Sequence, residues 1–161
     1  MDNHPEKPKT QKFAKAQTLV EFAIVFPVLL LITYGIIEFG RMLFIYTAVT
    51  GAAREGARVG ASALNYKNCD VIRQAVLDKA FLVPDAVVNT DIRYFNSSGS
   101  QVGVCSPGYT GPTLEVPGYR IRVTVTVPFS TIIPFPGIPE AAVNIVRQST
   151  RTILLGIYIE P

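Results

Sequence analysis

An apolar run of membrane length, interrupted by a single acid, constrains this chain more than any other feature. From Leu19 to Ile37 the only charged residue is Glu21. As a helix, this run would extend roughly 28 Å, close to the thickness of the hydrocarbon core of a bilayer. We therefore expect one transmembrane segment over about residues 19–37.

The charges before the apolar run predict its orientation. Four lysines and two acids precede it: Lys7, Lys9, Lys12 and Lys15 against Asp2 and Glu6. The positive-inside rule then places the N-terminus in the cytoplasm and the residues after Arg41 outside. A secretory signal peptide fits less well, because the run is too long and contains Glu21. We expect a single-pass protein of the cytoplasmic (inner) membrane.

Glu21 needs compensation in a membrane. A charged side chain costs roughly 2.5–3.5 kcal/mol at the centre of a transmembrane helix and less near its end. Cleavage between Ala16 and Gln17 would create an α-amino group, and Glu21 would become the fifth residue of the mature chain. The alternative is a carboxylate that reaches the nearby cytoplasmic interface.

Three segments carry a family resemblance: Gln17–Leu31, Gly35–Arg41 and Ala52–Arg58. They resemble the TadE-like pseudopilins of tight-adherence (Flp) pilus systems, which are related to type IV pili. Ala16 stands where the leaders of such proteins more often have glycine.

The resemblance implies a minor pilin or pseudopilin that is processed and assembled. A prepilin peptidase would remove residues 1–16 as a leader peptide, and Glu21 would pair with a mature N-terminal amine. An ATPase-driven assembly platform in the inner membrane would then move the subunit to the cell surface, in a pilus with roles in adhesion and secretion. The implied partners are other pilins or pseudopilins, the peptidase, the platform and membrane lipid.

Beyond the membrane we expect the helix to continue, so that it spans residues 17–62. Small residues recur every four positions, at Ala52, Gly56 and Gly60, which permits close helix packing. This row either packs on its own domain or contacts neighbouring subunits. Pro27 removes one helical hydrogen bond, and a kink or local unwinding is expected there, with or without a role in assembly.

Residues 63–161 predict a small extracytoplasmic domain. We expect a helix over 70–81 with Asp70 as its N-cap, a hairpin of strands over 87–95 and 102–104, and strands over 119–129 and 143–155. The proline-rich connector 128–139 either covers the core or presents an apolar contact. The predicted fold class is α+β and pilin-like, with a long N-terminal helix, a short helix and an antiparallel sheet.

Cys69 and Cys105 both fall on the predicted outer side of the membrane. Outside the cytoplasm, two cysteines form a disulfide more often than they remain free. Two buried thiols are the alternative.

The residue types argue against catalysis and against cofactor or metal binding. His4 is the only histidine and lies in the leader, so no catalytic triad or multi-histidine metal site is expected. No phosphate-binding glycine loop is present. Without a basic stripe with interleaved aromatics, nucleic acid is not an expected partner.

An uncleaved, membrane-anchored module that displays a binding domain is the alternative function.

Overall fold

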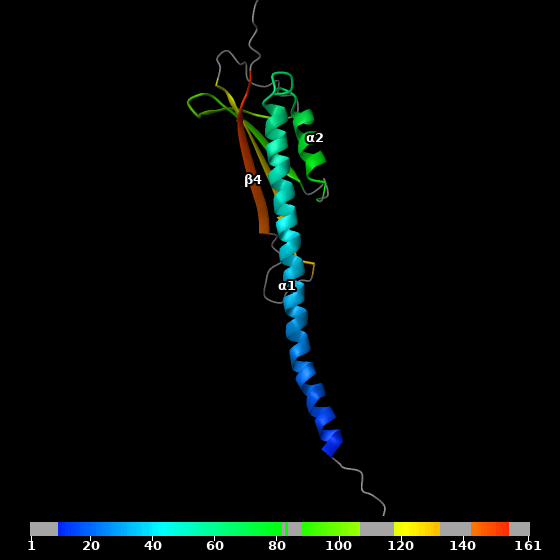
Figure 1. Ribbon diagram of the computed structural model, residues 1–161. Coiled ribbons are helices and arrows are strands. Elements are labelled where there is room, and N and C mark those ends of the chain that lie inside the picture. The colour runs from blue at the N-terminus through cyan, green and yellow to red at the C-terminus, as the bar shows by residue number, and fades with distance from the viewer. Residues whose placement is uncertain (1–9, 82, 84–87, 107–117, 133–142, 155–161) are drawn as a thin grey trace, which may run out of the picture. The chain divides into compact units, whose positions relative to one another are not determined.

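The computed structural model describes residues 10–81, 83, 88–106, 118–132 and 143–154. A long helix is followed by a short helix and four strands (Figure 1): α1 (Thr10–Gly60), α2 (Cys69–Lys79), β1 (Asn89–Phe95), β2 (Gln101–Val104), β3 (Arg120–Phe129) and β4 (Val143–Thr152). The predicted α+β class is confirmed. The chain divides into two compact units, Met1–Gly40 and Arg41–Pro161, and α1 contributes residues to both.

Helix α1 begins at Thr10, seven residues before the expected start at Gln17. Residues 10–16 are helical, although the expected helix starts only at residue 17, after the expected leader. The reason lies in their composition, because residues 11–16 contain neither glycine nor proline and include alanine, lysine and glutamine, which favour helices. At the other end, α1 stops at Gly60, close to the expected Ser62.

The four strands form one antiparallel sheet in the order β2-β1-β3-β4. Strand β3 lies inside the sheet, and its residues alternate between buried and more exposed positions, as its sequence predicts. Pro128 is tolerated in β3 because the pairing of β1 with β3 ends at Thr126. Beyond that point β3 pairs with β4 alone, so a missing backbone donor on its other side removes no ladder bond.

The predicted hairpin is formed by β1 and β2. Its turn is closed by a bond from the Asn96 N–H to the Ser100 carbonyl at 3.0 Å. The Asn96 side chain also accepts from the Ser100 N–H at 2.8 Å. Gly99 adopts a φ of +88°, a left-handed conformation that glycine enters without a steric penalty.

Helix α2 is close to its predicted position but begins with a different cap. Asn68, rather than the expected Asp70, is the N-cap, and its side chain accepts from the Val71 N–H at 3.2 Å. Asp70 lies in the first turn, where its negative charge interacts favourably with the helix dipole. The helix buries Ile72 and Val76, and it ends at Lys79 rather than at the expected residue 81, where Phe81 is exposed.

The core of the second unit lies between α1, α2 and one face of the sheet. On α1 the buried side chains are mostly small, and on β3 they are β-branched. The core is formed chiefly by Val49, Ala52, Ala53, Ala57, Ile72, Val76, Ile92, Tyr94, Ile121, Val123, Val125 and Val127. Most of the proline-rich connector lies outside the described residues, so its two alternative roles stay predictions.

Candidate assembly helix

The first unit presents an almost continuous apolar surface along α1. Leu19, Ile24 and Ile36 are each at least two-thirds exposed, with exposed fractions of 70%, 67% and 68%. By length and composition this helix could cross a membrane. Since exposed apolar side chains on this scale are unfavourable in water, the surface is suited to lipid or to other apolar helices.

The predicted cleavage point lies within α1. Ala16 and Gln17 are consecutive helical residues, and the Gln17 side chain is exposed. No extended segment separates the expected leader from the apolar run in the described residues. Processing between these two residues stays a prediction.

Glu21 lies one turn further along α1 and its side chain is exposed. No ion pair joins it to another residue in the described part of the chain. The pairing with an α-amino group that the resemblance implies therefore stays a prediction.

The helix continues without a break through Pro27. The local unwinding expected there does not occur, since residues on both sides of the proline keep helical hydrogen bonding. A proline inside a helix removes one bond of the ladder, and the remaining bonds hold the segment helical.

Glu38 is a second acid of the same unit, and it lies in Gly35–Arg41, one of the three segments that carry the family resemblance. It is only 8% exposed, and its carboxylate accepts a hydrogen bond from the Tyr34 hydroxyl at 3.0 Å. The two residues are four positions apart, so they meet on one face of the helix. The spacing of four residues between Tyr34 and Glu38 can be read from the sequence, and it indicates that the two side chains can be in contact.

In the second unit, the row of small residues packs inside its own domain. Ala52, Gly56 and Gly60 are buried. A Cβ atom on Gly56 would lie 2.5 Å from Val76 Cγ2 and 3.2 Å from Val123 Cγ1, and one on Gly60 would clash with the Ile121 side chain. Of the two expected arrangements, the row shows packing against its own domain, through α2 and β3, and its role in assembly stays a prediction.

The charged face of α1 carries an ion pair within the helix. Glu55 accepts from Nε and Nη2 of Arg58 at 2.9 and 2.6 Å. This hydrogen bonding lowers the pKa of Glu55 and raises that of Arg58. Arg54 is exposed beside them. The Glu55–Arg58 pair is partly solvated and lies within one helix.

Cys69 and Cys105 form a disulfide, with their Cα atoms 5.7 Å apart. Both residues are buried, and the bond joins the start of α2 to the residue that follows β2. The Cys105 carbonyl also accepts from Arg73 on α2 at 3.1 Å. The pair therefore has a structural position within the second unit.

One family model matches the chain: residues 16–58 match the TadE-like protein family. No curated protein and no solved structure matches. The matched segment begins at Ala16, includes Glu21, Pro27 and Glu38, and ends at Arg58, so it covers most of α1. Over residues 16–58 this chain is therefore similar to the TadE-like proteins, a similarity that is consistent with an association with the Tad pilus system.

Proposed function

We propose that this protein is a minor pilin or pseudopilin of the Tad (Flp-type) pilus, a structural or initiating subunit that assembles through α1. The observation that carries the proposal is the TadE-like match over residues 16–58. It coincides with a helix whose apolar side chains are exposed in the first unit. A helix of this kind can lie in the membrane before assembly and among other apolar helices afterwards.

The proposed path begins in the inner membrane, with the N-terminus in the cytoplasm. A prepilin peptidase cleaves between Ala16 and Gln17, so that the protein acts as a substrate and not as a catalyst. The new α-amino group then pairs with Glu21 of the same or a neighbouring pilin. In surroundings of low dielectric this attraction is much stronger than at a protein surface.

The surface available for contacts between subunits is the exposed part of α1. Since Ala52, Gly56 and Gly60 are covered by their own domain, the contacts fall on the apolar residues of about 19–37. A Cβ atom added to Gly35 or Gly40 would meet nothing within 4 Å, which leaves room there for the close approach of another helix. The partners are other pilins, together with the assembly platform and membrane lipid.

The test is the mature N-terminus of the protein in a host that carries the pilus system. Mass spectrometry of the protein recovered with sheared pili should show Gln17 as the first residue. A protein that retains Met1 and stays in the membrane fraction would contradict the proposal.

A second function is favoured by the helical state of residues 10–17. A peptidase needs an extended substrate, and a helix across the scissile bond must first unwind. An uncleaved protein would be a single-pass anchor that displays the second unit to an external ligand. Retention of Met1 together with normal surface exposure of the second unit would support this alternative.

A further inference from the structure

Strand β4 lies at one edge of the sheet, and among the described strands none pairs with its outer edge. In the order β2-β1-β3-β4 its only neighbour is β3. It pairs with β3 over ten consecutive positions without a bulge. Long, regular edge strands readily accept another strand, because their outward backbone groups are unpaired.

The register identifies which residues of β4 direct their backbone groups outward. The Cys105 N–H donates to the Ile92 carbonyl, so Ile92 faces β2 and the next residue, Arg93, faces β3. Arg93 is opposite Arg122, and the alternation along β3 and β4 then directs Ser149 inward and Gln148 and Thr150 outward. In the described part of the chain, no backbone group pairs with the outward groups between Asn144 and Thr152.

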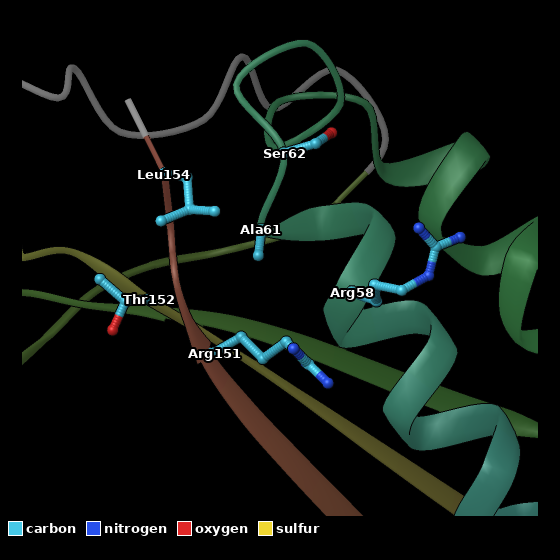
Figure 2. A pocket seen from close by; sticks show the side chains of 6 residues that line it. All are labelled: Arg58, Ala61, Ser62, Arg151, Thr152 and Leu154. Atoms are coloured by element: carbon cyan, nitrogen blue, oxygen red, sulfur yellow. The ribbon is translucent and has the colours of Figure 1, made fainter. Parts of the chain in front are cut away.

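The end of the same edge already accepts a second segment. The Leu154 N–H donates to the Ala61 carbonyl at 2.9 Å, and Ser62 and Leu154 form a parallel bridge. Figure 2 shows the backbone at Ala61 and Ser62 beside Leu154 at this end. Strand pairing on this side of β4 is therefore sterically feasible, and it stops after one bridge because the chain turns into the loop before α2.

Two hollows mark the space beside the open edge. One, of about 200 Å³, is lined by Met42 and Tyr46 of α1 and by residues 143–147 of β4. The other, of about 410 Å³, is lined by Arg58, Ala61, Ser62, Arg151, Thr152 and Leu154 (Figure 2). An added strand would lie beside the first hollow and would reach the second further along β4.

The charged side chains of β4 are all positive. Strand β4 contains Arg147 and Arg151 and no acid. Both arginines alternate with Ile145 and Ile153, so they share the face of β4 that packs toward the core. Figure 2 shows Arg151 extending from β4 toward α1. Arg58, which also lines the second hollow, is bound by Glu55 at 2.6 Å.

Arg147 holds a buried donor that an incoming acid could satisfy. Its guanidinium stacks on Tyr46, with Cζ 4.0 Å from the ring centroid. Its Nε atom is buried and has no hydrogen-bond acceptor among the described residues. A buried donor without a partner is unfavourable, and a carboxylate placed beside Arg147 would accept its hydrogen bond.

We propose that the outer edge of β4 accepts an extended, acidic segment of another protein as an added strand. Its backbone pairs with the outward groups between Asn144 and Thr152, and its acidic side chains, at alternate positions, meet Arg147 and Arg151. A second copy of β4 is a poor occupant, because pairing two such strands would bring their arginines together. The inference concerns the second unit alone and does not depend on cleavage or on a pilus role.

The test uses the full chain in detergent and a labelled nine-residue peptide of alternating valine and glutamate. Fluorescence anisotropy should show binding that weakens as salt is raised. The same peptide with N-methyl groups on alternate backbone nitrogens keeps its charge but cannot donate to β4, and it should bind at least about tenfold more weakly. Equal binding of the two peptides would reduce the interaction to charge alone and overturn the proposal.

Two protein variants separate the edge from its charges. Gln148→Pro removes an outward N–H without removing a bond to β3. This variant should lose peptide binding while keeping the thermal midpoint of the protein. Gln148→Ala is the matched control and should bind the peptide normally. Arg147→Glu/Arg151→Glu should lose the valine–glutamate peptide and bind a valine–lysine peptide instead. Should Gln148→Pro fail to fold, the comparison of N-methylated and plain peptides on the unaltered protein decides.

Other occupants give distinct results. Peptide binding that arises only after deletion of residues 155–161 would assign the edge to the chain itself. A dimer that dissociates on Gln148→Pro would assign it to a second copy. Either result would overturn the proposal of an acidic partner segment.

Discussion

Val76 Cγ2 lies 2.5 Å from the point that a Cβ atom on Gly56 would occupy. The two residues belong to α1 and α2, and the absence of a side chain on Gly56 allows the two helices to pack at this distance. Val76 is fully buried and β-branched, so its side chain has little freedom to move aside. The glycine is therefore required by packing inside the domain.

Gly56→Ala should lower the free energy of unfolding by about 1–2 kcal/mol, because overpacking outweighs the gain in helix propensity. The matched control is Gly51→Ala in the same helix, where an added Cβ meets nothing within 4 Å. That change should raise the free energy of unfolding by up to about 1 kcal/mol. Denaturant unfolding of both variants tests the pair, and equal effects would show that Gly56 is not tightly packed.

Replacement of both cysteines, as Cys69→Ala/Cys105→Ala, should destabilise the second unit. The disulfide closes a loop with a sequence separation of 36 residues. Loss of such a cross-link costs about 2–4 kcal/mol, in part through the larger conformational freedom of the unfolded chain. Chemical unfolding with and without a reductant measures the effect, and the double variant should be insensitive to the reductant.

Glu21→Gln should leave the protein inserted and folded while its recovery with sheared pili falls sharply. The amide keeps the size of the side chain but cannot pair as an anion with an α-amino group. Glu21→Asp, which keeps the charge, is the control and should retain part of the recovery. Normal recovery of Glu21→Gln would indicate that the carboxylate only contacts the interface.

Ala16→Leu should prevent the conversion to a form about 16 residues shorter, because a bulky side chain obstructs the scissile bond. Gel mobility and intact mass report the conversion. Ala14→Leu, two residues upstream, is the control and should be processed normally. Equal processing of both variants would place the cleavage elsewhere or with another peptidase.

Local patterns in the sequence predicted the elements well. The alternation along β3 follows from the period of two in a strand, and the apolar part of α1 follows from the length and composition of its run; both are confirmed. The helical state of residues 10–16 was not predicted, because these residues were assigned to the leader although their composition favours a helix. The N-cap of α2 was misplaced by two residues, since asparagine and aspartate cap equally well.

The contacts between elements could not be predicted from local patterns. The row of Ala52, Gly56 and Gly60 indicated a close approach but not its partner, because a small residue permits contact with any surface. Only the fold places Val76 and Ile121 against it. The same is true of the sheet order, which leaves β4 at the edge, and of the contact between Arg147 and Tyr46.

The disulfide also has a consequence for the timing of folding. Strand β2 has four residues, is mostly exposed and pairs only with β1, so the ladder alone holds it weakly. The covalent bond from Cys105 to Cys69 fastens the end of β2 to α2. In a reducing compartment this disulfide does not form. The second unit should therefore reach its final rigidity only after the disulfide has formed.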